Sequence, residues 1–440
     1  MRVDRYTEDA FSTLSNTIVD KAPYFGSLPL QNDVFELFFK DQNGQAHSIN
    51  LASATNEQVS TLAESCSIAP FGRGAQSVID DDYRKAGKID LPNFAIPFRP
   101  EDTALGRGVR EYVLDGLESK RPIRYELDKL NVYGKGGFFK AHKDTPRGNG
   151  MFGSLVLIYP TKHSGGDLVF RHQGHEWTFD SASAALSNGN TAFGYAAFYS
   201  DIEHEVLPVT SGYRVTITYN LYFDDAETAS TSTRSIAPDM SDFAHRLRHL
   251  LDDSHFMPQG GYLGFGLRHA YPVEFADNFM PVHEDVQHIT SVLKGSDAVI
   301  LRAAQAAGLQ AQLHVAYDCR VYSKEYKRLV VLTTKVIGGE YAPGQIWSFL
   351  KNQYGGVTLW PEDDEKYRVE RAVHWVTPRT SAPRGKSALA TYGNSPSVEH
   401  QYWELCLLVG VGPVGERTTK ENLRQNTEDK KYEVGYEWLD

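Results

Sequence analysis

Cysteine is scarce in this chain, whose 440 residues contain only Cys66, Cys319 and Cys406, far apart from one another. Three separated cysteines provide neither a framework of disulfides nor a Cys-x-x-Cys pair for zinc. Free thiols are typical of reducing compartments. We therefore expect a cytoplasmic or nuclear protein.

Long hydrophobic runs and an excess of positive charge are missing as well. No apolar run approaches the ~18 residues of a membrane span, and the first residues, MRVDRYTEDAF, lack the apolar stretch of a secretory signal. Lysine and arginine number 45 against 56 acidic residues, which gives a net charge of −11. An acidic surface disfavours a general grip on phosphate backbones. We expect neither a membrane nor a nucleic acid as a partner.

Aromatic residues, in contrast, are abundant, with 24 Tyr and 22 Phe, a composition that suits strands. A chain of this length exceeds one ordinary core, which predicts two domains. Residues 224–240 are small and polar without periodicity and are interpreted as a linker. The predicted organisation is an N-terminal helical and loop region with a core (1–223, core 124–223), the linker, a C-terminal α+β domain (241–412) and a polar tail (413–440).

The predicted core consists of short strands. Between residues 124 and 223, aromatic or β-branched stretches alternate with Gly, Asn, Pro or Ser, which favours an antiparallel jelly roll, or double-stranded β-helix. Apolar spacing ahead of the core predicts helices over 4–22, 56–66 and 103–120, and Asn43-Gly44 predicts a hairpin turn. The fold class is therefore α+β, mainly β.

A His-x-Asp pair, His142 and Asp144, precedes His204 by about sixty residues. Such a pair alone is background, because roughly two His-x-acid matches are expected from composition; a second, at His283 and Asp285, precedes a predicted helix and is interpreted as surface. His142 and Asp144 instead follow a glycine-broken aromatic strand, where positions i and i+2 point the same way. Two imidazoles and one carboxylate leave three metal positions open, as in non-haem Fe(II) oxygenases.

Arg214 stands ten residues after His204 in an alternating run, where it shares one face with Thr216 and Thr218. A buried guanidinium needs an anion and pairs well with a carboxylate in bidentate geometry. A dicarboxylic cosubstrate would supply that carboxylate. Considered alone, Arg214 also fits the solvent face of an amphipathic strand.

Taken together, the motifs of residues 124–223 resemble the 2-oxoglutarate- and Fe(II)-dependent dioxygenase superfamily, specifically its prolyl-4-hydroxylase-like branch. The matching stretches are Tyr133 with the glycines after it, the His-x-Asp pair, GGDLVF at 165–170 and HEVLPVTSGYR at 204–214. The resemblance implies Fe(II), 2-oxoglutarate and O2, and leaves ascorbate open. It implies that His142, Asp144 and His204 are the catalytic iron ligands, that Arg214 binds the distal carboxylate of 2-oxoglutarate, and that Tyr133 and Thr216 contact this cosubstrate.

Two positions depart from the family pattern. Many relatives have lysine where Arg214 stands, which preserves the charge, and tyrosine where Phe139 stands, so that a hydroxyl is missing from the pocket. The carboxylate of Asp144 argues against the halogenating relatives, which lack it.

The expected reaction is hydroxylation of an unactivated C–H bond with release of succinate and CO2. The resemblance favours a prolyl residue of a protein or peptide as the substrate. Two alternatives stay open: hydroxylation, desaturation or epoxidation of a small metabolite, and a non-catalytic cupin-like binding protein. The layout also resembles proteins in which a second, metal-free β-helix-like domain follows the oxygenase core, and the sequence does not indicate the oligomeric state.

Further candidates lie around the core. His163, His172 and His175 flank the GGDLVF stretch and are interpreted as solvent-exposed, with a second metal site as the alternative. Tyr83 and Arg84, together with Arg73, lie on a long loop-rich segment and are candidates for gating or binding the substrate, with a solvated loop as the alternative.

Overall fold

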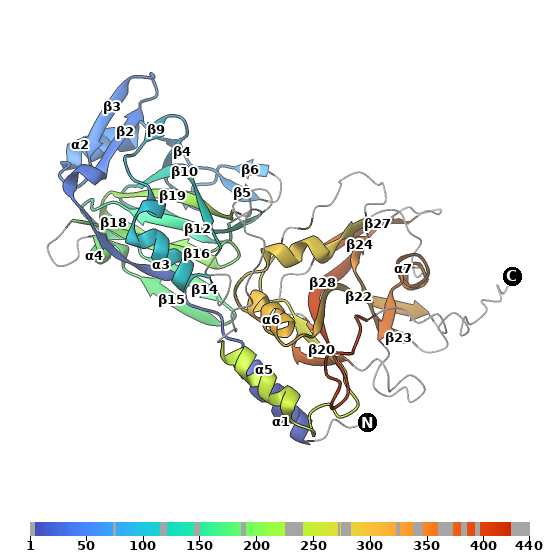
Figure 1. Cartoon of the computed structure of the whole chain (residues 1–440). Helices are drawn as coiled ribbons and strands as arrows, with labels where there is room; N and C mark the ends of the chain where they lie inside the picture. The colour runs from blue at the N-terminus through green and yellow to red at the C-terminus, as the bar shows by residue number, and fades with distance from the viewer. Residues whose placement is uncertain are drawn as a thin grey trace. The chain divides into compact units, whose positions relative to one another are not determined.

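The chain folds into two compact units (Figure 1). One comprises Asp20–Ser235 and is called the N-terminal unit; the other joins Met1–Val19 to Ile236–Asp440 and is called the C-terminal unit. The computed structural model describes residues 5–73, 76–114, 121–144, 150–185, 191–224, 241–271, 273, 283–322, 326–337, 346–359, 373–379, 385–391 and 397–423.

The N-terminal unit contains a seven-stranded antiparallel sheet whose long central strands are almost entirely buried. Strands buried on both faces are continuously apolar, as FGSLVLI and AFGYAAF are here. In pairing order its strands are β1 (Tyr24–Pro29), β16 (Ala192–Tyr199), β12 (Met151–Ile158), β19 (Arg214–Phe223), β10 (Ile123–Tyr133), β8 (Gly87–Asp90) and β4 (Ser67–Ile68).

A five-stranded sheet shares its core with this larger sheet. Its strands are β15 (His175–Phe179), β14 (Leu168–His172), β17 (Glu203–Val206), β11 (Phe138–His142) and β7 (Arg84–Lys85). Phe170 of this sheet contacts Phe198 of the larger one, with ring centroids 5.0 Å apart. Two such sheets around one apolar core form the predicted double-stranded β-helix, which is confirmed.

Shorter elements surround the two sheets (Figure 1). The turn at Asn43-Gly44 joins two strands as predicted, and Thr55 begins the second predicted helix with a capping box. The elements are η1 (Asn32–Phe35), β2 (Glu36–Lys40), β3 (Ala46–Asn50), α2 (Asn56–Glu64), β5 (Phe71–Arg73), β6 (Gln76–Val78), β9 (Phe94–Ala95), η2 (Pro100–Asp102), α3 (Ala104–Tyr112), β13 (His163–Gly165), α4 (Ser181–Ala185) and β18 (Val209–Gly212).

The C-terminal unit is α+β, with a second seven-stranded sheet and several helices. The sheet runs β25 (Val357–Leu359), β23 (Tyr326–Thr333), β22 (Gln310–Tyr322), β28 (Ser397–Val411), β20 (Gly261–Gly266) and β26 (Val373–Thr377), and β27 (Gly385–Thr391) also pairs with β28. The remaining elements are α1 (Arg5–Asn16), α5 (Asp242–Asp252), β21 (His283–Asp285), η6 (Val286–Val292), α6 (Gly295–Ala306), β24 (Lys335–Ile337) and α7 (Ile346–Tyr354).

The division of the chain differs from the predicted one at both ends. Helix α1 lies beside α5 (Figure 1), and Leu14 and Ile18 belong to the core of the C-terminal unit. Residues 413–423, assigned above to a polar tail, pack on this unit: Arg417 donates hydrogen bonds to several backbone carbonyls, and Leu423 is buried. Residues 225–240 of the predicted linker and 424–440 of the predicted tail lie outside the described residues.

The helices in the described part of the chain are all too short or too polar to cross a membrane. The second His-x-Asp pair lies in β21, and Asp285 caps the following η6 by accepting a hydrogen bond from the amide of Gln287. This carboxylate therefore has a local structural partner at a helix start.

Candidate active site

Strand pairing in the smaller sheet brings the three predicted iron ligands together. His142 ends β11 and lies directly opposite His204 of β17, and Asp144 follows two residues later. Their ligand atoms lie within 4.8 Å of one another. His204 Nε2 is 3.8 Å from Asp144 Oδ1, and the two imidazole centroids are 4.2 Å apart. The fold thus assembles two imidazoles and one carboxylate from two adjacent strands.

Hydrogen bonds orient both imidazoles in the same way. Nδ1 of His142 lies 2.8 Å from the carbonyl oxygen of Lys140, and Nδ1 of His204 lies 3.0 Å from that of Ile202. A carbonyl oxygen only accepts, so each Nδ1 carries a proton, and Nε2 is the nitrogen that has a lone pair in the neutral ring. Both histidines therefore present the nitrogen that a metal binds, with the outer hydrogen bond typical of metal-ligating histidines.

Asp144 is held by a residue that the sequence analysis did not single out. Ser154 of β12 donates a hydrogen bond of 2.5 Å to Asp144 Oδ2, which leaves Oδ1 on the side of His204. The available signal was a single polar residue within the apolar stretch FGSLVLI. Ser154 is nearly fully buried, so its hydroxyl needs a partner, and the carboxylate provides it.

The electrostatics of this cluster match a site for a divalent cation. Burial lowers the pKa of His142, and the neighbouring His204 lowers it further, so the ring is neutral. Burial alone would raise the pKa of Asp144, but His204 and the hydrogen bond from Ser154 bring it below its ordinary value. The neutral imidazole of His142 and the ionised carboxylate of Asp144 are in the protonation states in which such side chains bind metals.

Arg214 begins β19 and is only 1 % exposed. Its Nε donates a hydrogen bond to Ser181 Oγ at 3.2 Å, whereas the buried Nη2 has no hydrogen-bond partner within the described part of the protein. Burial lowers the pKa of Arg214 to about 10, so the guanidinium is still charged at neutral pH. The solvent-facing alternative is therefore wrong, and a buried cation has a donor available for an anion.

The other two predicted cosubstrate residues lie around Arg214. Tyr133 is directly opposite Arg214 in the pairing of β10 with β19, and its ring centroid is 5.4 Å from Arg214 Cζ. Thr216 is buried and follows Arg214 on the same face of β19.

Gly166 belongs to this pocket as well. A Cβ at this position would lie 2.7 Å from Arg214 Cδ, and the backbone there has a φ of +78°. Glycine is therefore required at position 166, because the aliphatic part of the Arg214 side chain occupies the space that a Cβ would need.

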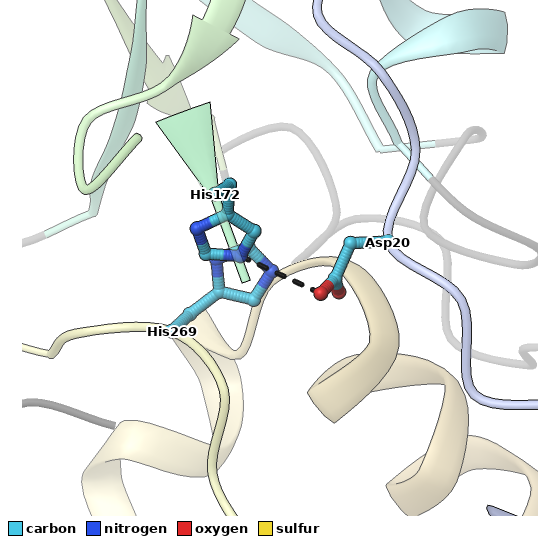
Figure 2. Close-up of side chains that lie close together, drawn as sticks. All are labelled: Asp20, His172 and His269. Atoms are coloured by element: carbon cyan, nitrogen blue, oxygen red, sulfur yellow. Dashed lines mark ion pairs between the residues drawn. The ribbon is translucent and has the colours of Figure 1, made fainter. Parts of the chain in front are cut away.

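The flanking histidines differ from one another. His172 is buried, against the prediction of an exposed position, and its Nε2 lies 3.5 Å from Asp20 Oδ2 (Figure 2). His175 is exposed as predicted, and His163 is half-buried with Nδ1 2.8 Å from the Thr161 carbonyl oxygen. Among the residues that the structure describes, these three do not form a common ligand group.

The segment at residues 66–98 forms short strands, and two of its candidate residues lie near the cluster of His142, Asp144 and His204. The Tyr83 hydroxyl donates a hydrogen bond of 2.8 Å to the carbonyl oxygen of Ala141, next to His142. Arg84 is buried beside Phe139. The side chain of Arg73 lies outside the described residues.

Comparison with known proteins gives a match over the segment that contains this site. The sequence model of the 2OG-Fe(II) oxygenase superfamily matches residues 129–222, which include every predicted site residue. The match to this superfamily is confined to that segment, 94 of the 440 residues. The match supports an enzyme of the 2-oxoglutarate-dependent dioxygenase type, and the predicted superfamily is confirmed. The alternative of a non-catalytic binding protein gains no support from this comparison.

Similar solved structures include an oxidoreductase of the 2OG-Fe(II) oxygenase family from Burkholderia pseudomallei, with 15 % identity, coverage of 38 % of this chain and 77 % of that one, and a TM-score of 0.24. A prolyl-4-hydroxylase from Pseudomonas putida has 15 % identity, coverage of 49 % and 99 %, and a TM-score of 0.29. A prolyl hydroxylase from Trichoplax adhaerens, in complex with a hypoxia inducible factor peptide fragment, has 19 % identity, coverage of 53 % and 99 %, and a TM-score of 0.27. A comparison with curated proteins gave no match.

Proposed function

We propose that this protein hydroxylates an unactivated C–H bond of a prolyl residue in a protein or peptide, with Fe(II), 2-oxoglutarate and O2. The observation that carries the assignment of roles is the pair of imidazoles with free Nε2 atoms beside the Asp144 carboxylate. His142, Asp144 and His204 would hold the iron, because this donor set in these protonation states suits Fe(II).

The second half of the proposal concerns the cosubstrate. Arg214 would pair with the distal carboxylate of 2-oxoglutarate, supported by its burial and its unpartnered Nη2. Tyr133 and Thr216 would line the same pocket, since both lie next to Arg214 in the sheet. These residues fix the cosubstrate by one end and exclude water around it.

When bound, Fe(II) supplies the oxidation chemistry, in which one oxygen atom of O2 enters the substrate as a hydroxyl and the other enters succinate as 2-oxoglutarate loses CO2. The described side chains themselves orient and bind. Hydrogen bonds from Nδ1 atoms and from Ser154 fix the donors before the metal arrives, which lowers the entropy lost on binding.

The roles are tested by succinate formation from 2-oxoglutarate with the full-length protein. We expect His142→Ala and Asp144→Ala to abolish it, with His175→Ala, at an exposed histidine, as the control. Arg214→Ala should mainly raise the 2-oxoglutarate concentration needed for half-maximal rate. Full turnover in either ligand variant would refute the metal assignment, and an unchanged 2-oxoglutarate requirement would remove the role of Arg214.

The substrate is tested separately, because the resemblance that favours a prolyl residue also allows a small metabolite. Proline-containing peptides and a set of small metabolites would be incubated with the enzyme and examined by mass spectrometry. Gain of one oxygen atom on proline supports the proposal. Turnover of metabolites alone, by hydroxylation, desaturation or epoxidation, would replace the prolyl substrate without changing the cofactor assignment. Adding ascorbate in parallel shows whether it sustains turnover.

A further inference from the structure

Arg84, Phe139 and His142 form a stack of three flat groups. The rings of Phe139 and His142 are nearly parallel, with centroids 3.5 Å apart and planes inclined by 22°. The guanidinium carbon of Arg84 lies 4.3 Å from the Phe139 centroid. Two groups this close to one ring cannot share a face without overlapping, so Phe139 lies between the guanidinium and the imidazole.

Arg84 is anchored independently of His142. Its Nη1 donates to the carbonyl oxygen of Pro70 at 2.7 Å, and its Nη2 donates to Asn131 Oδ1 at 2.8 Å. Two bonds to different nitrogens fix the plane of a guanidinium, which a lysine ammonium cannot reproduce. The side chain is 6 % exposed, so these bonds form away from water. Asn131 in turn lies in β10 directly opposite Thr216, on the strand that carries Arg214.

His142 needs such support more than His204 does. His204 is buried in the middle of β17, and its ring contacts that of Phe198 at 4.6 Å. His142 is only partly buried and lies at the last position of β11, and its hydrogen bond to Lys140 fixes one ring atom but not the plane of the ring. The terminal torsion of histidine is soft. A flat partner stacked on the imidazole restricts this torsion.

We propose that Arg84 is a positioning residue for the metal centre: it holds Phe139, and through Phe139 it holds the His142 ring with Nε2 toward the metal. The inference rests on the proposed role of His142 as a ligand and extends it to a residue on a different strand, β7, which the His-x-Asp motif does not include.

The experiment measures Mn(II) affinity of the full-length protein by electron paramagnetic resonance of the free ion, without turnover. The variants are Arg84→Met, which keeps the apolar stem, Arg84→Lys, which keeps the charge, and Phe139→Leu, which removes the flat ring. Arg121→Met is the matched control. Arg121 is also buried, and its guanidinium carbon lies 3.6 Å from the Phe223 centroid, at the opposite end of β19 from Arg214.

We expect Arg84→Met and Phe139→Leu each to weaken Mn(II) binding about tenfold or more, as loss of outer-shell support typically does. Arg84→Lys should not restore affinity, whereas Phe139→Tyr, which keeps a stacking ring, should bind as the unaltered protein does. The double variant Arg84→Met/Phe139→Leu should bind no more weakly than Phe139→Leu alone, because both changes break one stack.

Unaltered affinity in Arg84→Met, or an equal loss in Arg121→Met, would overturn the proposal, since the arginine would then act only on general stability. Additive losses in the double variant would also overturn it. If Arg84→Met does not fold, Arg84→Lys and the two Phe139 variants decide the question. His142→Ala separates the two hypotheses: if it binds Mn(II) as tightly as the unaltered protein, the proposed function itself fails.

Discussion

At the scale of single residues, the site depends on groups whose hydrogen-bonding capacity is only partly used. Arg214 makes one hydrogen bond through Nε and keeps a buried Nη2 free of protein partners in the described region. A buried unsatisfied donor costs about 1–3 kcal/mol. We expect a ligand carboxylate to offset this cost, which would make the pocket selective for ligands with a carboxylate in that position.

Gly166→Ala tests whether the path of the Arg214 stem matters. The new methyl group would lie 2.7 Å from Arg214 Cδ, so the guanidinium must move. Gly174→Ala is the control, because its φ of +82° carries the same backbone strain with nothing within 4 Å. Both variants should lose about 1–2 kcal/mol of stability for a side chain in the left-handed region. Only Gly166→Ala should raise the 2-oxoglutarate requirement, and equal requirements would contradict this reading.

The residues of the proposed site can be selected from the sequence because their chemistry is carried by residue type and spacing. His142, Asp144, His204 and Arg214 could be selected in this way. Ser154 could not, because its role arises from the contact between β12 and Asp144, which follows β11 in the chain. Sequence spacing contains no information on such contacts between strands.

At the scale of elements, strands with regular alternation or continuous apolar runs were predictable and irregular ones were not. β19 was predicted from its alternating run. β1, in contrast, contains a glycine and a proline, yet it pairs along its whole length with β16, more than 160 residues away. The loop-rich segment that contains β7 gave no strand signal either, because two residues are too few for a pattern. These strands form because they pair by backbone hydrogen bonds with strands from distant parts of the chain.

Asp297 connects two elements of the C-terminal unit. Its carboxylate, on α6, accepts hydrogen bonds from the amides of Arg268 and His269, both at 3.0 Å, and from the Tyr271 hydroxyl at 2.8 Å, in the segment after β20. The carboxylate is buried, and its loss removes a charged acceptor from three donors.

We therefore expect Asp297→Ala to lower the free energy of unfolding of the C-terminal unit by about 3 kcal/mol, measured by urea denaturation. Asp252→Ala, at an exposed position in α5, should change it by less than about 0.5 kcal/mol. Because the proposed metal ligands lie in the N-terminal unit, Mn(II) affinity should not change in either variant. A similar small effect of both substitutions would show that these hydrogen bonds contribute little.

At the scale of the whole molecule, the C-terminal unit is built from two separate segments of the chain. Residues 1–19 group with residues 236–440, and the entire N-terminal unit lies between them in the sequence. The amphipathic pattern of Phe11, Leu14 and Ile18 predicted a helix correctly. It could not predict which core the helix joins, because any apolar groove satisfies an amphipathic face equally well.

Leu14→Ala tests this assignment. The side chain is fully buried in the core of the C-terminal unit, so its truncation should cost about 3 kcal/mol. Hydrogen exchange should show the loss of protection in α5 and β20, with the strands of the N-terminal unit unaffected. Val19→Ala, at an exposed position, should have no effect. Loss of protection confined to β10 and β19 would mean that α1 supports the oxygenase unit instead.

The discontinuity of the C-terminal unit also sets an order of events during synthesis. Helix α1 is translated before the N-terminal unit, but α5, which it contacts, is translated more than 220 residues after α1. The intervening N-terminal unit can complete its sheets in that interval, since domains generally fold as they emerge. The apolar face of α1 stays without its core throughout this time, so we expect chaperones to bind α1 in the nascent chain.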